Sequence, residues 1–398
     1  MENTSKYYSP SDAVSVVPVG DYTDVGSAKT ALIKLLSAIN GLDVIKSGMR
    51  VVIKANLVSA MKPDEAATTH PVLLSALSEI LTEMGAEVVI GDSPGGLYTS
   101  AFVNRVYNVT GMRETEKHGA RLNDDFSQCE AEFPEGKALH SFKYTGYLDK
   151  ADAIINFCKL KSHGMMGMSC AAKNMFGVVP GVTKPEYHFR FPKYEDFADM
   201  IVDLNEYFHP VLSICDAVVG MEGNGPTAGT PKKMGCLIAS RSPHALDMVA
   251  AKILGFEREE LPILSAAYLR GMIPERFEEI TLYGSLDELL LSDFERVVER
   301  KSLEFSGNGK GVIKKLRGKI LGAILKTKPA LKKDMCVGCG VCANICPAKA
   351  IKIVKKKAII DRKLCIRCFC CQEFCPKSAM KVHRTPIAKL FTSSKKDK

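Results

Sequence analysis

Long hydrophobic runs are missing from this sequence of 398 residues. No stretch reaches the roughly 18 uninterrupted apolar residues that a membrane-spanning helix requires, so we predict no transmembrane segment. The first residues, MENTSKYYSPSDAVSVVPVG, lack the basic and apolar regions of a secretory signal, and we expect a cytoplasmic protein. The composition of 46% hydrophobic and 25% charged residues is that of a globular protein, which excludes disorder over the whole chain.

Motifs for nucleotides and nucleic acids are also lacking. The glycine-rich segment MEGNGPTAGTP (221–231) is neither a GxxxxGK motif followed by Ser or Thr nor a GxGxxG after a strand. It is either a structural turn or a ligand loop whose backbone amides bind an anion. We find no zinc-finger, helix-turn-helix or RNA-binding signature and expect no nucleic-acid partner.

Cysteine, by contrast, is plentiful and unevenly placed. Nine of the 14 cysteines lie between Cys336 and Cys375, which in a reducing compartment favours metal binding over disulfides. Charge is divided in the same way. Residues 1–309 carry 30 Lys and Arg against 41 Asp and Glu, a net charge of −11, whereas residues 310–398 carry 24 against 4, a net charge of +20. The differences indicate at least two units with different partners.

The cysteine-rich segment is an internal repeat. The stretch CVGCGVCANICPAKAIKIV (336–354) returns 29 residues later as CIRCFCCQEFCPKSAMKVH (365–383), and both copies read C-x2-C-x2-C-x3-C-P. This spacing suits iron–sulfur clusters, with the fourth cysteine of each copy ligating the other cluster. Zinc is the alternative, but it explains neither the third cysteine nor the Cys-Pro pairs. The predicted ligands are Cys336, Cys339, Cys342 and Cys375 for one 4Fe-4S cluster, and Cys365, Cys368, Cys371 and Cys346 for a second.

The repeat resembles the bacterial two-cluster ferredoxin over about residues 334–384. The resemblance implies a small α+β domain that accepts and releases single electrons, usually at low potential. Cys370 is an extra thiol beside Cys371, and we interpret it as a bystander.

A basic segment, residues 309–333, joins the two units. Its pattern predicts a linker helix that ends at Pro329 and docks on the acidic unit. A helix lying on a membrane surface is the less favoured alternative. Its apolar residues follow helical spacing: Ile313, Leu316, Ile320 and Ile324. The predicted organisation is an α/β domain at 1–308, the linker at 309–333, the ferredoxin domain at 334–384 and a basic tail at 385–398.

The large domain alternates strand-like and helix-like stretches. Apolar runs read as buried strands in AVSVVPV, RVVIKANL, AEVVIGD, DAIINFCKL, VLSICDAVVG and MGCLIAS. Helical patterns lie between several of them, at Ser27–Asn40, Pro71–Met84, Glu195–Phe208 and Pro243–Leu254. This alternation predicts an α/β fold with a mostly parallel sheet and helices on both faces.

Polar side chains follow several of these strands: Asn56, Asp92, Lys159, His163, Asp216 and Glu222. In open α/β sheets, ligands bind outside the carboxyl ends of the strands. One aspartate at a strand end is usually a helix cap or a turn former, but several such residues favour one shared site.

The segment KLKSHGMMGMSCAAKNMFGVVPG (159–181) is the densest in functional groups. Its glycines permit close approach of the backbone to a ligand, its lysines favour an anion, and His163 can transfer protons near neutral pH. The alternative is a glycine-rich loop that enters a helix, with His163 satisfied by hydrogen bonds. The side chains expected to converge in one site are Lys159, His163, Lys173, Asp92 and Glu222.

The motifs KANL, TTHP, GDSPGG, KLKSHG, AAKNMFG and EGNGPTAGTP resemble the domain-of-unknown-function 362 family, which is often fused to ferredoxin modules. The resemblance covers about residues 12–285, but the family has no general assigned activity. Its shared polar residues correspond to His70, Lys159, His163, Lys173, Asn174, Glu222 and Asn224.

A weaker similarity links His163, Lys173 and Pro180-Gly181 to the nickel-pincer lactate racemase family. There the histidine is an acid/base and the lysine holds the cofactor, but His70 stands where that family has arginine, and the other ligand histidines have no clear counterpart. The similarity implies only an acid/base site for an anion.

We therefore predict an iron–sulfur electron-transfer protein in which two 4Fe-4S clusters exchange low-potential electrons with a substrate or cofactor site on the α/β domain. The expected partner is a redox protein or a small anionic substrate. The alternatives are an electron carrier whose large domain only docks partner enzymes, and a non-redox, racemase-like enzyme with structural clusters. Whether the protein is an enzyme, as a ferredoxin-linked oxidoreductase, stays open. The candidate catalytic residues are His163, Lys173 and Glu222, and the candidate substrate-binding residues are Asn56, His70, Asp92, Lys159, Asn174 and Asn224.

Overall fold

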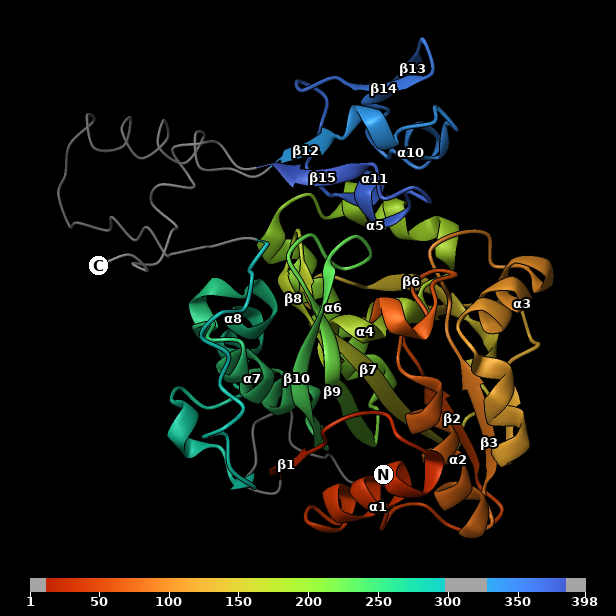
Figure 1. Cartoon of the computed structure of the whole chain (residues 1–398), viewed down its shortest axis with the longest axis vertical. Coiled ribbons are helices and arrows are strands. Elements are labelled where there is room, and N and C mark those ends of the chain that lie inside the picture. Colours follow the sequence, from red (N-terminus) through yellow and green to blue (C-terminus); the bar gives the residue numbers. More distant parts are fainter. Residues whose placement is uncertain (1–11, 298–327, 384–398) are drawn as a thin grey trace, which may run out of the picture.

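The computed structural model describes residues 12–297 and 328–383. They form an α/β unit, residues 12–297, and a C-terminal unit, residues 328–383, which lies above the sheet in Figure 1. Most of the predicted linker helix and the basic tail fall outside these residues. None of the helices in the two described ranges has the length and hydrophobicity needed to cross a membrane.

A mixed sheet with strand order β11-β1-β10-β9-β7-β2-β3-β4 forms the centre of the α/β unit, and β8 pairs with β7 at its end. The run from β9 to β4 is parallel, and β10 is antiparallel to both of its neighbours. The predicted, mostly parallel sheet is therefore confirmed. The strands are β1 (Val14–Pro18), β2 (Arg50–Lys54), β3 (Glu87–Gly91), β4 (Ala120–Leu122), β7 (Ala153–His163), β8 (Gly167–Ser169), β9 (Leu212–Glu222), β10 (Thr230–Ser240) and β11 (Leu282–Tyr283). A separate hairpin joins β5 (Gln128–Glu132) to β6 (Ser141–Thr145).

Helices cover both faces of the sheet, as predicted. Alternate residues of β2 show the division, since Val51 and Ile53 belong to one hydrophobic cluster and Val52 to the other. The first cluster contains helices α1 (Val25–Ser37), α2 (Pro71–Glu83) and α3 (Ser100–Val109). The second contains α4 (Ala171–Asn174), α5 (Lys184–Arg190), α6 (Tyr194–Phe208), α7 (Pro243–Ile253) and α8 (Pro262–Leu269).

Helix α1 shows why these segments form helices. The Asp24 side chain accepts a hydrogen bond from the Ser27 backbone N–H and so caps the first turn. The buried residues Ala28, Leu32, Leu35 and Leu36 recur at helical spacing and form one apolar stripe against the sheet.

The C-terminal unit is a small α+β fold. Its antiparallel pairs are β12 (Lys328–Leu331) with β15 (Met380–His383) and β13 (Ile351–Val354) with β14 (Lys357–Ile360), and its short helices are α10 (Val341–Asn344) and α11 (Cys370–Glu373). Because β12 pairs with β15, Lys328–Leu331 belong to this unit, although they precede the domain boundary predicted at residue 334.

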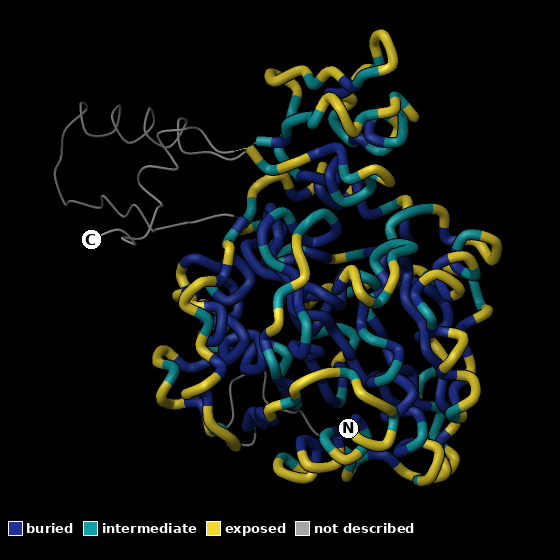
Figure 2. The backbone as a smooth tube through the Cα atoms, viewed as in Figure 1, coloured by how far each residue is buried: buried dark blue, intermediate teal, exposed yellow. Residues whose placement is uncertain are grey.

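The C-terminal unit docks on the carboxyl edge of the parallel strands through α11 and β15. Phe369 is buried in the hydrophobic core of the α/β unit, and the Gln372 amide donates hydrogen bonds to the carbonyl oxygens of Asn224 (2.7 Å) and Gly225 (2.9 Å). Figure 2 shows buried backbone running through this junction, whereas the far side of the C-terminal unit is mostly exposed or half-buried. The two units are therefore in buried contact at the place where ligands of such a sheet are expected.

Candidate functional site

The cysteines of the C-terminal unit line two separate cavities. One is lined by Cys336, Cys339, Cys342 and Cys375, and the other by Cys346, Cys365, Cys368 and Cys371, together with Cys370. These are the two sets of four that the repeat spacing predicts. Four thiols around one hollow are the donor set of a 4Fe-4S cluster, so the residues present fit that cofactor.

The two Cys-Pro cysteines have equivalent surroundings. The Ala350 backbone N–H donates to Cys346 Sγ at 3.3 Å, and the Ala379 backbone N–H donates to Cys375 Sγ at the same distance. Each of these sulfur atoms thus accepts one backbone hydrogen bond, and hydrogen bonds to the ligand sulfurs are among the features that set the potential of an iron–sulfur cluster.

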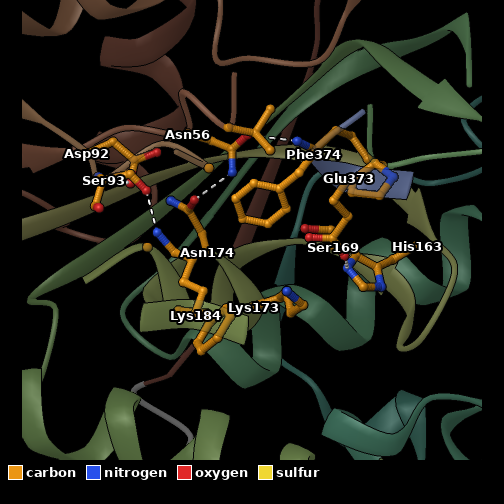
Figure 3. A pocket seen from close by; sticks show the side chains of 16 residues that line it. Asn56, Asp92, Ser93, His163, Ser169, Lys173, Asn174, Lys184, Glu373 and Phe374 are labelled. Atoms are coloured by element: carbon orange, nitrogen blue, oxygen red, sulfur yellow. Dashed lines mark hydrogen bonds and ion pairs between the residues drawn. The ribbon is translucent and has the colours of Figure 1, made fainter. Parts of the chain in front are cut away.

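A further pocket, the interdomain pocket, lies between the two units (Figure 3). The α/β unit supplies most of its wall and the C-terminal unit supplies Glu373 and Phe374. The polar and charged side chains around it are Asn56, Asp92, Ser93, Lys161, His163, Ser169, Lys173, Asn174, Lys184 and Glu373. The structure thus brings together five of the predicted residues: Asn56, Asp92, His163, Lys173 and Asn174.

A change of register in the sheet separates Lys159 from Lys161. Lys159 lies opposite Asp216 of β9, but Lys161 lies opposite Met221, so several residues of β9 bulge between them. Lys159 is consequently held outside the interdomain pocket: its Nζ lies 2.8 Å from Asp216 Oδ2 and donates to the Tyr22 hydroxyl at 2.8 Å. The prediction that Lys159 joins His163 and Lys173 is wrong.

Lys161 takes the place predicted for Lys159. Its Nζ donates to Asn56 Oδ1 at 2.8 Å and to the Ala67 carbonyl at 2.7 Å, both neutral acceptors. Burial lowers the pKa of Lys161 to about 7, with Lys159 and Lys173 adding to the effect and Asp92 and Glu373 opposing it. The alternation of residues 159, 161 and 163 on one strand was the available sequence signal for Lys161.

His163 faces the C-terminal unit. Its Nδ1 accepts from the backbone N–H groups of Met165 and Met166, each at 3.1 Å, so any ring proton of the neutral form resides on Nε2. That Nε2 lies 3.1 Å from Glu373 Oε1, an ion-pair distance without hydrogen-bond geometry. Burial lowers the pKa of His163, as does Lys173, while Glu373 opposes the shift.

Glu373 is a carboxylate in a cationic setting. Burial alone raises its pKa, but His163, Lys173 and His188 outweigh burial and hold the pKa at about 2. Residue 373 carried no sequence signal for this site, because its role depends on the docking of the two units.

Lys173 projects from α4 beside aromatic rings. Its Nζ lies 5.0 Å from the centroid of Phe176 and 5.9 Å from that of Phe197, and burial lowers its pKa. The neighbouring Asn174 accepts from Asn56 Nδ2 at 2.8 Å and donates to Asn156 Oδ1 at 2.8 Å, which ties α4 to β2 and β7.

Asp92 and Lys54 form a buried ion pair at one end of the pocket, with 2.7 Å between Oδ1 and Nζ. The other oxygen of Asp92 accepts from the Leu57 backbone N–H at 2.7 Å. Gly177 passes so close to this pair that a Cβ added there would displace the Asp92 carboxylate and the Lys54 ammonium group. Nearby, Lys184 donates to the Ser93 carbonyl, and burial lowers its pKa to about 7.

Three other predicted residues lie outside the interdomain pocket. Glu222 ends β9 in the β9–β10 hairpin, where its carboxylate accepts from the Glu295 backbone N–H at 2.9 Å and lies 3.9 Å from Lys232. Asn224 bridges the units, since its Oδ1 accepts from the Val382 backbone N–H at 2.9 Å. His70 caps α2 and stacks on Tyr22, with 3.7 Å between the ring centroids. The prediction that Glu222 converges with His163 is wrong.

His70 belongs to a second group, the Tyr22 cluster, which consists of the half-buried Tyr22 and His70 and the buried Lys159 and Asp216. Asp216 accepts from the His70 backbone N–H at 3.0 Å and from the Tyr22 hydroxyl at 2.6 Å, in addition to its ion pair with Lys159. The members of the cluster bind one another, and none of them lines the interdomain pocket.

The sequence model of the family described as Domain of unknown function (DUF362) matches residues 51–252, half of the chain. This chain belongs to the DUF362 family. A 4Fe-4S binding domain matches residues 329–352 of the same DUF362 protein, a range that begins in β12.

Two individual proteins are similar to this DUF362 protein. The thylakoid-associated protein sll1697 of Synechocystis sp. is 30% identical over 262 residues, which cover 64% of this chain and 78% of that protein. The lactate racemase apoprotein of Thermoanaerobacterium thermosaccharolyticum has a TM-score of 0.36 at 10% identity, over 63% of this chain and 57% of that one. This chain thus matches little more than half the length of that racemase.

Proposed function

We propose that this DUF362 protein is an electron-transfer protein in which the C-terminal unit exchanges electrons with a small molecule in the interdomain pocket. One observation carries the proposal: Glu373 and Phe374 line the pocket, and they stand in the chain between Cys371 and Cys375, one from each four-cysteine cavity. Glu373 is two residues from Cys371 and two from Cys375, and two residues of backbone span at most about 7 Å. The pocket is therefore close to both cavities.

Each cavity is suited to one 4Fe-4S cluster, which gives two per chain. When bound, such clusters supply single electrons, commonly at low potential. The backbone N–H groups of Ala350 and Ala379 donate to the sulfur atoms of Cys346 and Cys375 and so help to fix the positions of these two ligands.

His163 is the candidate proton donor of the site. Because Nδ1 is occupied by two backbone N–H groups, Nε2 is the ring nitrogen able to give or take a proton, and it faces the pocket wall at Glu373. Lys173 lies beside it and is placed to bind and orient an anionic substrate. The pair would supply the proton that accompanies reduction of a bound molecule, as in a ferredoxin-linked oxidoreductase.

The electron donor in this proposal is a redox partner protein. Cys339 is exposed, in contrast to the other cysteines of its cavity, so electrons would enter on that side. The interdomain pocket favours this function over a carrier whose α/β unit only docks partners, since a docking surface needs no buried lysines or histidine.

The test is anaerobic purification followed by stoichiometric reduction and stopped-flow reoxidation with candidate acceptors. We expect reoxidation by at least one small anionic acceptor to slow by two orders of magnitude or more in His163→Ala while iron content is unchanged. Equal reoxidation rates in wild type and variant for every acceptor would refute the role of the pocket.

A further inference from the structure

Three buried lysines line the interdomain pocket and a fourth, Lys54, pairs with the lining residue Asp92, which is unusual because lysine is almost never buried unless it is paired. Lys54 and Lys161 are at most 1% exposed, Lys173 is 8% exposed and Lys184 is 9% exposed. Such a concentration of cations in a shielded place has a large free-energy cost unless negative charge is near.

The carboxylates present do not balance these lysines. Asp92 is engaged by Lys54, and the Glu373 carboxylate faces His163. Lys161 and Lys184 donate only to neutral oxygen atoms, and Lys173 has no hydrogen-bond acceptor within residues 12–297 and 328–383. Among the side chains of the pocket, three lysines thus share the single carboxylate of Glu373, which leaves these side chains with an excess of two positive charges when all are ionised.

The pocket also offers uncharged donors. The buried Ser93 hydroxyl lines it and has no hydrogen-bond partner among the residues described. Ser169 lines it as well, whereas the Asn56 and Asn174 amide groups in its wall already donate to neighbouring side chains. A cavity of about 70 Å³ holds a molecule of only a few non-hydrogen atoms, since one water needs about 10–15 Å³ by the same measure.

We propose that the interdomain pocket binds a small dianion, a dicarboxylate or an oxyanion of phosphate type, between Lys161, Lys173 and Lys184. The proposal rests on the proposed function in treating this pocket as the substrate site, and it names the class of substrate. Two negative charges compensate the excess of two positive charges, and the Ser93 hydroxyl supplies a further hydrogen bond.

A protonation change accompanies this binding. Burial holds the pKa of Lys161 and of Lys184 at about 7, so both are largely neutral at pH 8. Around Lys161 stand Lys159, Lys173, Asp92 and Glu373, and around Lys184 stand Asp92, Lys54, Lys173 and Glu373. A bound dianion favours the charged form of each lysine and raises its pKa, so binding at pH 8 takes up protons.

The experiment uses the anaerobically purified, full-length protein with its clusters, titrated by calorimetry at constant ionic strength. Malonate and hydrogenphosphate test the organic and inorganic forms of a dianion, and acetate is the monoanion control. At pH 8, in two buffers of different ionisation enthalpy, we expect at least one dianion to bind ten times more tightly than acetate with uptake of about one proton or more.

The variants Lys161→Met and Lys184→Met should each weaken dianion binding more than tenfold, whereas Lys117→Met, an exposed lysine paired with Glu114, should leave it unchanged. Equal affinity for acetate and both dianions, or no proton uptake, overturns the proposal; these two readouts need no variant and decide the matter if the substituted proteins do not fold.

Failure of the proposed function looks different. If a dianion binds with the expected proton uptake, but reoxidation of the reduced protein is the same in wild type and His163→Ala for every acceptor, the binding site stands and the electron-transfer role falls. If only neutral acceptors reoxidise the protein and no dianion binds, the electron-transfer role stands and the dianion site falls.

Discussion

Two lysines on one strand, Lys159 and Lys161, have opposite surroundings. Lys159 in the Tyr22 cluster has a carboxylate at 2.8 Å and lies outside the interdomain pocket, whereas Lys161 has only neutral hydrogen-bond partners and lines that pocket. Both are buried. Residue type and burial are therefore not enough to identify a functional lysine. The better indication is a lysine that lacks a charged partner and lies next to a cavity.

Removing the lysine that has a charged partner, Lys159, should have the largest effect on the free energy of unfolding. Lys159→Met leaves Asp216 buried without its counter-ion, so the free energy of unfolding should fall by about 3–5 kcal/mol in urea titrations. The matched control is Lys117→Met at an exposed ion pair, which should change stability by about 0.5 kcal/mol or less. A loss in Lys159→Met no larger than in the control would show that the Tyr22 cluster is not a structural ion-pair network.

Removing a lysine that lacks a charged partner should instead reduce ligand binding. Lys173→Met removes a buried cation that lacks a hydrogen-bond acceptor among the described residues, so stability should be unchanged or rise, while ligand binding is lost. Thermal unfolding, iron content and ligand titration on one preparation provide the check. A large loss of stability together with loss of iron would place Lys173 with the structural lysines.

Stability should also depend on pH through the underpaired lysines. The pKa of Lys161 and Lys184 is about 7 in the folded protein and about 10.4 in an unfolded chain, so between these values the unfolded state binds more protons. Stability contributed by these groups therefore rises with pH from 7 toward 10, by at most about 1.4 kcal/mol per pH unit for each lysine. Denaturation at pH 7, 8 and 9 should show a smaller rise in Lys161→Met and Lys184→Met than in wild type. Parallel curves would mean that these lysines titrate normally.

A second pair of neighbours should show the smallest effect. Cys370 lines the same cavity as Cys371 but is not in the repeat spacing, so Cys370→Ala should retain all of the iron, about eight per chain. The comparator Cys339→Ser, which removes one predicted ligand, should lose about half. Loss of iron from Cys370→Ala, or two zinc ions in place of iron, would require a different ligand assignment.

The elements of the fold were predictable because each is coded locally. Continuous apolar runs such as RVVIKANL and DAIINFCKL gave buried parallel strands, and helical spacing gave α1, α2, α6 and α7 to within a few residues. The β9–β10 hairpin and the register shift beside Lys159 are set by pairing between distant residues, which no local pattern records.

The site was predictable in part for the same reason. His163 and Lys173 lie on one dense segment and line one pocket, as expected. Glu222 and Asn224 were misplaced because the hairpin and the docked unit, not the sequence motif, decide what they face. Glu373 and Phe374 were missed because they enter the pocket only when two units far apart in the chain come together.

The hydrogen bonds of Gln372 have a consequence for substitutions at the junction. This side chain donates hydrogen bonds to the main-chain carbonyl groups of Asn224 and Gly225. Both carbonyl groups remain available whatever side chain position 224 carries. Position 225 is constrained by space alone, since an added Cβ would lie 2.3 Å from the Ser162 carbonyl oxygen. Substitution at position 224 would therefore remove the Asn224 side-chain bonds across the junction but leave both Gln372 bonds in place, so the C-terminal unit would keep part of its attachment.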